Sequence, residues 1–127
     1  MPRVFTILLV DDEPLMCEIL SFELALAGFR VLTTDSGDSA FELCLNNDID
    51  CVISDIRMFG SSGFTLVKNL RLSTKSWLPV ILMTGFSDHE ADDFMSLGNI
   101  ELFSKPFSPS DLIMRVQQLL NEDRAAS

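Results

Sequence analysis

Short apolar runs alternate along the chain with longer stretches in which apolar residues recur at helical spacing. The runs have the length of β-strands and lie at 4–10, 29–33, 50–54, 79–83 and 100–103. The stretches that follow them repeat apolar residues every three or four positions, which is typical of helices that cover one face of a sheet. The pattern therefore predicts an α/β fold with a parallel sheet and helices on both faces.

Polar and turn residues at the ends of the helical stretches support this assignment. Asp12 precedes Pro14, which predicts an N-cap and an early helical position, and Gly28 predicts the end of the first helix. Serine and glycine introduce the second and third helices, at 36–46 and 61–72. We expect these helices to connect strands by right-handed crossovers.

The same pattern sets the extent of the domain. A weakly patterned helix is predicted at 87–98, and the last helix begins near Ser108. We expect one domain over residues 1–127, with a core at about 4–120 and a frayed tail at 121–127. The fold class expected is α/β, a (βα)5 doubly wound fold with a five-stranded parallel sheet, for which the flavodoxin-like strand order 2-1-3-4-5 is one of two common arrangements.

The composition excludes several classes of protein function. The chain has 127 residues, 47% of them hydrophobic, and a net charge of −10 from 19 acidic and 9 basic residues. The acidic balance argues against direct binding of nucleic acid or of an anionic membrane surface. Apolar runs do not approach the ~20 residues of a membrane span, and a signal-peptide pattern is lacking, so we expect a cytoplasmic protein. Cys17, Cys44 and Cys51 have no metal-ligand spacing and are expected to be free thiols.

The residues that come directly after the strands carry the candidate chemistry. Asp11 and Asp12 follow the first strand, Asp55 the third, Thr84 the fourth and Lys105 the fifth. Ligands of open parallel sheets bind outside the carboxyl ends of the strands, where the strand order reverses. If the strand order is 2-1-3-4-5, the first and third strands are neighbours, and the three aspartates would then converge. Their repulsion would be compensated by a divalent cation such as Mg²⁺.

This set of residues suits phosphoryl transfer to a carboxylate. Asp55 is the candidate nucleophile, while Asp11 and Asp12 would hold the metal. Lys105 would place a positive charge on the phosphoryl group, and the Thr84 hydroxyl would donate a hydrogen bond to it. Each residue also has a simpler interpretation: Asp12 as an N-cap, Thr84 as a strand terminus and Lys105 as a solvated lysine. The combined pattern at one sheet edge favours the chemical interpretation.

The motifs "LLVDDEP", "VISDIRM" followed by "GSSGF", "PVILMTG" and "FSKPF" together resemble the response-regulator receiver domain, the phosphoacceptor of two-component signalling. The resemblance covers the chain from Val4 to about Leu120. The separations also match the family, with 29 residues from Asp55 to Thr84 and 21 from Thr84 to Lys105.

The resemblance implies a set of roles and partners. Asp55 would accept a phosphoryl group from a sensor histidine kinase, a phosphotransfer protein or a small phosphodonor. Mg²⁺ would be bound by Asp12, Asp55 and the backbone carbonyl of Arg57, with Asp11 acting partly through water. The Lys105–Pro106 peptide bond is expected to be cis, as in the family. On this interpretation the chain is a phosphoacceptor and not a conventional turnover enzyme.

The resemblance also implies an output surface. Phosphorylation would change the surface of the fourth helix, fifth strand and fifth helix, which a downstream effector protein or domain reads. A homodimer through the same elements is left open, and so is the choice between a single-domain regulator and a receiver from a longer protein.

Two positions depart from the family pattern. Phe59 replaces the usual proline after Met58, and Leu102 occupies the position of a switching tyrosine or phenylalanine. These departures weakly support an alternative, a phosphorylation-independent protein-interaction domain on the same fold. A metal-dependent phosphatase with an aspartyl nucleophile is poorly supported, because Arg57 stands where such enzymes place a general acid.

Overall fold

The computed structural model describes residues 4–56, 62–85 and 98–126, with side chains described as far as residue 120. The helix expected at 87–98 lies almost wholly outside these residues, as do Arg57 and Phe59. The strands are β1 (Thr6–Val10), β2 (Arg30–Thr34), β3 (Cys51–Asp55), β4 (Val80–Thr84) and β5 (Ile100–Ser104), and the helices are α1 (Pro14–Leu26), α2 (Gly37–Asn46), α3 (Gly63–Arg71) and α5 (Pro109–Ala126).

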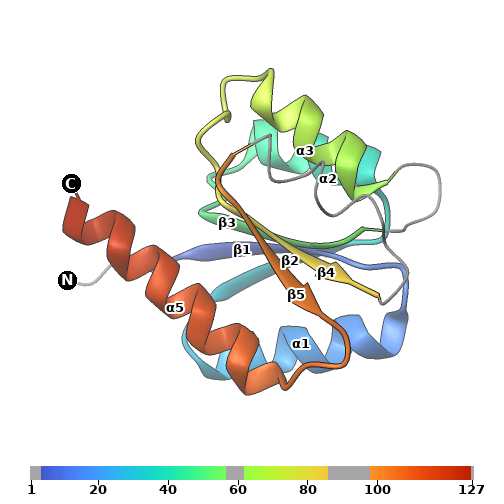
Figure 1. Ribbon diagram of the computed structural model, residues 1–127, viewed down its shortest axis with the longest axis vertical. Helices are drawn as coiled ribbons and strands as arrows, with labels where there is room; N and C mark the ends of the chain where they lie inside the picture. Colours follow the sequence, from blue (N-terminus) through green and yellow to red (C-terminus); the bar gives the residue numbers. More distant parts are fainter. Residues whose placement is uncertain (1–3, 57–61, 86–97, 127) are drawn as a thin grey trace.

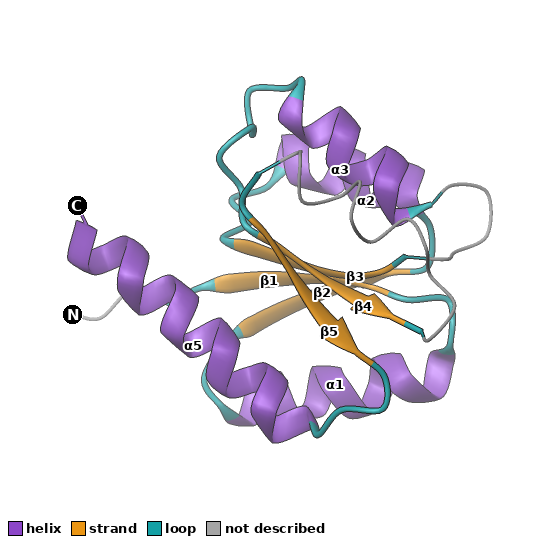
Figure 2. Cartoon of the chain, viewed as in Figure 1, coloured by secondary structure: helices purple, strands orange, loops and turns teal. Residues whose placement is uncertain are grey.

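The five strands form one parallel sheet in the order β2-β1-β3-β4-β5. Helices α2 and α3 cover one face of the sheet, and α1 and α5 cover the other (Figures 1 and 2). The predicted flavodoxin-like fold class is therefore confirmed. The order places β1 and β3 side by side, and all five carboxyl ends open onto the same edge.

Two separate cores explain why the central strands read as unbroken apolar runs. Successive side chains of a strand point to opposite faces, so a strand covered on both sides needs apolar residues at every position. In β1, Leu8 and Val10 pack with α2 and α3, whereas Ile7 and Leu9 pack with α1 and α5. All four side chains are fully buried, which makes β1 a rigid central strand.

Helix boundaries agree with the predictions in the middle of the chain and differ at the start of α1. The hydroxyls of Ser36 and Ser62 cap α2 and α3 by accepting hydrogen bonds from backbone N–H groups three residues later. The N-cap of α1 is Glu13, with no side-chain hydrogen bond, so the prediction of Asp12 as the cap was wrong. The backbone of α5 is helical as far as Ala126. The expected fraying of residues 121–127 stays a prediction.

Other features also agree with the sequence. Gly28 follows the C-terminus of α1 with a φ of 98°, a conformation that glycine adopts without strain. The three cysteines are free thiols. None of the helices in the described residues is long and apolar enough to cross a membrane.

At the amino edge of the sheet, opposite the carboxyl ends, Arg71 connects two loops. Its guanidinium donates hydrogen bonds to the carbonyl oxygens of Leu78, Gly98 and Asn99, at 2.9, 3.1 and 3.2 Å. The Asn99 side chain donates in turn to the carbonyl of Trp77 at 2.7 Å. The entries into β4 and β5 are thereby fixed to the end of α3.

A close backbone contact at Gly63 fixes the start of α3 against the end of β3. The Gly63 N–H donates to the carbonyl of Ile56 at 2.7 Å. A Cβ atom at this position would lie 2.8 Å from the carbonyl oxygen of Asp55 and 3.1 Å from the Cα of Ile56. Because both of these are backbone atoms, neither can move aside without displacing the end of the strand.

We expect Gly63→Ala to lower the free energy of unfolding by about 1–3 kcal/mol, as is usual for overpacking of a tight site. Urea unfolding measures the effect. Asn69→Ala, at an exposed position of the same helix, places alanine in α3 without the clash and should be at least as stable as wild type. A Gly63→Ala protein as stable as Asn69→Ala would contradict the contact.

Candidate phosphoacceptor site

Asp55 is the last residue of β3 and forms an ion pair across the carboxyl edge of the sheet. The Lys105 Nζ lies 2.7 Å from Asp55 Oδ2, close enough for a charge-assisted hydrogen bond. The Asp55 side chain is 12% exposed and the Lys105 side chain 28% exposed. The carboxylate is therefore largely shielded but still accessible from the edge of the sheet.

The position of Lys105 follows from the register of the sheet. Thr84 pairs with Ser104 at the ends of β4 and β5, and the backbone N–H of Lys105 donates to the Thr84 carbonyl at 2.7 Å. The Lys105–Pro106 peptide bond is cis, as the resemblance implied. The Thr84 side chain is buried at the same edge. Thr84 and Lys105 are thus brought to the same edge as Asp55.

Asp11 is buried directly after β1, and among the residues that the structure describes only one of its oxygens has a partner. Its Oδ1 accepts a hydrogen bond from the backbone N–H of Glu13 at 2.9 Å. Its Oδ2 is buried without a hydrogen-bond partner. A buried carboxylate oxygen left without a donor is costly, so this atom marks a place where a cation or a donor is favoured.

Electrostatics agree with this geometry. Burial raises the pKa of Asp11 above its ordinary value of 3.8, the hydrogen bond from Glu13 opposes the rise, and the charge of Asp55 adds to it. Burial acts to lower the pKa of Lys105, but the hydrogen bond and charge of Asp55 outweigh it, so this pKa is raised from 10.5. The described part of the site therefore holds mutually repelling carboxylates and one ammonium group, which contacts Asp55.

The predicted metal ligands are only partly assembled. Asp12 is half-buried beside Asp11, and the carbonyl of Arg57 lies outside the described residues. Within the ranges that the structure describes, no three His, Cys, Asp or Glu side chains form a group that could hold a metal ion. The unpartnered Asp11 Oδ2 nevertheless fits Mg²⁺, which binds few carboxylates and keeps several waters.

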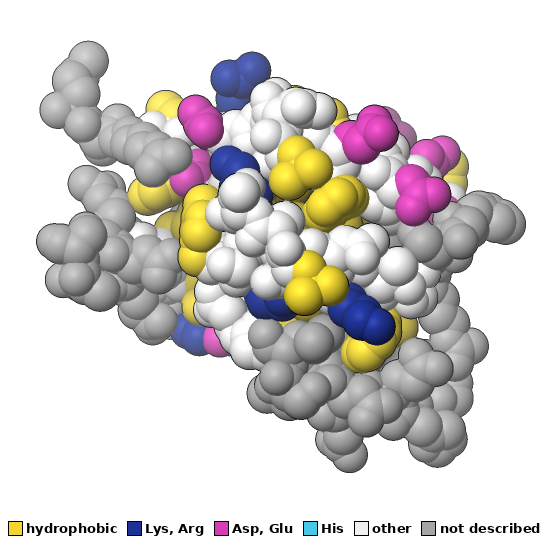
Figure 3. Space-filling model, turned by 90° about the horizontal axis from the view of Figure 1, so that it is seen from above, with side chains coloured by type: hydrophobic (Ala, Val, Ile, Leu, Met, Phe, Trp, Pro, Cys, Tyr) yellow, Lys and Arg dark blue, Asp and Glu magenta, His cyan; other side chains and the backbone are white. Residues whose placement is uncertain are grey.

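Basic side chains do not dominate the surface seen in Figure 3. On the described part of this face, Lys and Arg side chains lie separated by apolar and neutral groups, with acidic side chains along its margins. This distribution is in keeping with the net charge of −10.

Two features of the site were missed by sequence reasoning. One is the contact of Gly63 with the Asp55 backbone, for which the only signal was a glycine after two serines at the start of a helix. The other is an apolar cavity beside Lys105, described below.

The fold and the site define a response-regulator receiver. The family model of the response regulator receiver domain matches residues 7–117, so the chain belongs to that family. It is 36% identical over 115 residues to the response regulator SaeR of Staphylococcus aureus (strain USA300), covering 90% of this chain and 50% of that protein. The chain thus spans about half the length of the curated relatives it matches.

Solved structures show the same relationship. A putative response regulator from Chloroflexus aurantiacus J-10-fl is 31% identical, with a TM-score of 0.85 over 94% of this chain and 99% of that one. The receiver domain of the sensor histidine kinase PA1611 from Pseudomonas aeruginosa PAO1, at 21% identity and a TM-score of 0.84, covers 94% of this chain and 99% of that one. That structure has a magnesium ion coordinated in its active site cleft, and at this identity the likeness to it shows the fold alone.

Asp11→Asn is expected to raise the free energy of unfolding at pH 7 in the absence of divalent cations. A carboxyl whose pKa is raised by folding destabilises the folded state above that pKa, and the cost disappears below the unfolded value of 3.8. The amide removes the buried charge and keeps the acceptor for the Glu13 N–H. Urea unfolding with a chelator present measures the change.

The control for this prediction is Asp48→Asn, which removes an equal charge from an exposed position and should have little effect. A loss of stability in Asp11→Asn at pH 7, or an equal gain in both variants, would contradict the assignment of an uncompensated buried charge.

Proposed function

We propose that the chain is a phosphorylation-switched signalling receiver that accepts a phosphoryl group on Asp55. The observation that carries the proposal is the 2.7 Å pair between Lys105 Nζ and Asp55 Oδ2, beside the buried, unpartnered Oδ2 of Asp11. An acceptor carboxylate, a fixed cation and an unsatisfied anionic ligand atom thus lie at one edge of a rigid sheet. Phosphoryl transfer requires mainly such positioning and charge neutralisation.

Each described residue has a definite part in this reaction. An oxygen of the Asp55 carboxylate attacks the phosphorus of the donor, and the bond from phosphorus to the donor's leaving atom breaks. Lys105 transfers its hydrogen bond from the carboxylate to a phosphoryl oxygen, for which its flexible stem is suited. The Thr84 hydroxyl, at the end of the neighbouring strand, donates to another phosphoryl oxygen.

Mg²⁺ is the proposed cofactor. Asp11, Asp12, Asp55 and the backbone carbonyl of Arg57 would hold it, with Asp11 acting partly through water. When bound, the ion neutralises negative charge on the carboxylates and on the phosphoryl oxygens.

The proposed partners are those of two-component signalling. A sensor histidine kinase or a phosphotransfer protein in the cytoplasm supplies the phosphoryl group, and a downstream effector protein or domain reads the altered surface of the fourth helix, β5 and α5. A homodimer through these elements is one form that the output can take. The chain acts in this way as a phosphoacceptor and not as a conventional enzyme.

One observation favours a second function, a protein-interaction domain that works without phosphorylation. Leu102 of β5 packs half-buried against the core shared with α2 and α3. A branched aliphatic side chain held in this way lacks the ring by which receivers couple the site to the surface. The two functions differ in whether Asp55 is modified at all.

Incubation with acetyl phosphate and Mg²⁺ should therefore add one phosphoryl group to the wild-type chain, measured by intact mass. Asp55→Asn should abolish the modification, because the amide is not a nucleophile, whereas Asp48→Asn should leave it unchanged. An unmodified wild-type chain, or a modified Asp55→Asn chain, would contradict the proposed function.

Mg²⁺ should also raise the melting temperature, because it binds the folded acid cluster and not the unfolded chain. At about 100 times its dissociation constant the expected stabilisation is about 2.7 kcal/mol. Asp12→Asn should shift the required Mg²⁺ concentration upward, and Asp48→Asn should not. An equal response to Mg²⁺ in all three proteins would contradict the ligand assignment.

A further inference from the structure

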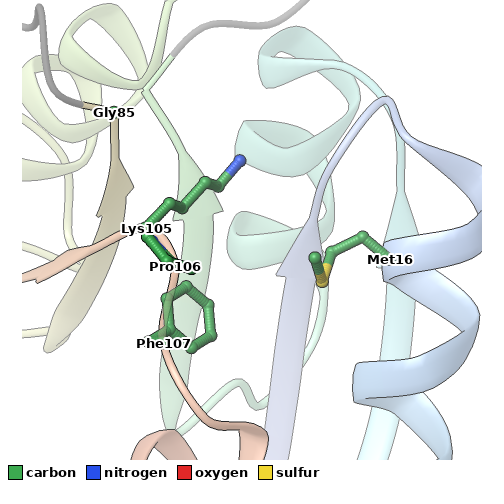
Figure 4. Close-up of a pocket in the computed structure, with 5 residues that line it drawn as sticks. All are labelled: Met16, Gly85, Lys105, Pro106 and Phe107. Carbon is green, nitrogen blue, oxygen red and sulfur yellow. The ribbon is translucent and has the colours of Figure 1, made fainter.

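An apolar cavity opens directly beside the phosphoacceptor site. It has a volume of about 400 Å³ and is lined by Met16, Gly85, Lys105, Pro106 and Phe107. Figure 4 shows that Met16 approaches from α1 on one side, while Lys105, Pro106 and Phe107 follow β5 on the other. The walls are a thioether, a proline ring, a phenyl ring and the methylene stem of Lys105.

The cavity is continuous with the site already described. The stem of Lys105 lines it, while the ammonium at the end of the same side chain contacts Asp55 at 2.7 Å. Gly85 lines it directly after Thr84. A molecule whose phosphoryl group meets Asp55 can therefore place the rest of its structure in the cavity.

The wall formed by Phe107 is preorganised by its packing. The ring of Phe107 packs edge-to-face on Phe103, with centroids 5.8 Å apart and the planes at 88°. Phe107 and Met16 both pack against the core formed with α1 and α5. A cavity of this size with apolar walls and one cationic group has the character of a small-molecule pocket.

We propose that this cavity receives the apolar part of a small acyl phosphate, so that the chain prefers phosphodonors with a longer apolar acyl group. The charges of Asp11 and Glu13 act on Lys105, which lines the cavity, and such negative charges disfavour a negatively charged acyl group. The inference rests on the proposed function, since it concerns the donor used by Asp55.

The reaction itself is balanced without any further reagent. An oxygen of the Asp55 carboxylate forms a bond to phosphorus, and the bond between phosphorus and the acyl oxygen breaks. The electron pair leaves with that oxygen as a free carboxylate, such as butyrate. The apolar chain does not react and contributes only through its burial in the cavity.

The test compares acetyl phosphate with butyryl phosphate as donors, with Mg²⁺ present and the second-order rate of Asp55 phosphorylation followed by intact mass. Each methylene group that becomes fully buried is expected to multiply the rate constant by about four. Butyryl phosphate should therefore react up to about fifteenfold faster than acetyl phosphate with the wild-type chain.

Variants of the cavity wall test whether the preference for butyryl phosphate comes from the cavity or from the donor itself. Met16→Gln keeps the side-chain length but makes this wall polar, so it should slow butyryl phosphate much more than acetyl phosphate and thereby remove most of the preference. Met16→Leu keeps the wall apolar and should retain the preference. Met114→Gln, at an exposed position on α5, is the matched control and should behave as wild type.

Each outcome is decisive. Equal rates for the two donors in wild type, or a preference that survives Met16→Gln, would overturn the cavity as an acyl site and leave phosphorylation of Asp55 intact. Failure of both donors to modify Asp55 would overturn the proposed function and this inference together.

Discussion

The burial of negative charge at the carboxyl edge of the sheet is the constraint on which the rest of this structure depends. Asp11 follows β1 and Asp55 ends the neighbouring strand β3, and both strands are mostly apolar and buried on both faces. Such strands hold the two carboxylates close together and do not yield to their repulsion. Among the described residues, Lys105 offsets part of that repulsion through its ion pair with Asp55. Asp11 Oδ2 has no hydrogen-bond partner in that part of the chain.

The same constraint explains how much of the fold and site could be predicted. Because β1, β3 and β4 are covered on both faces, their apolar runs are unambiguous, and the residue after each run identifies the edge. Asp55, Thr84 and Lys105 were placed at one edge for this reason. Their chemical roles remain predictions, since location at an edge does not fix the reaction.

The N-cap of α1 and the role of Gly63 depend on interactions that local sequence patterns do not specify. Asp12 was expected to cap α1, but Asp11 accepts the hydrogen bond from the Glu13 N–H, and Glu13 is the cap residue. The role of Gly63 depends on a tertiary backbone approach, which no local pattern specifies.

The hydrogen bonds of Arg71 determine where β5 begins against β4. They fix the start of β5 from α3, and the Val80 N–H adds a bond to the Asn99 carbonyl, so the register of β5 on β4 is established at Gly98 and Asn99. The distance from there to Lys105 is then set by a strand of constant length. The position of Lys105 against Asp55 is therefore set by Arg71, Gly98, Asn99 and the β4–β5 register. A hydrogen-bonded clamp at the amino edge of the sheet thus determines where the cation lies at the opposite edge, one strand length away.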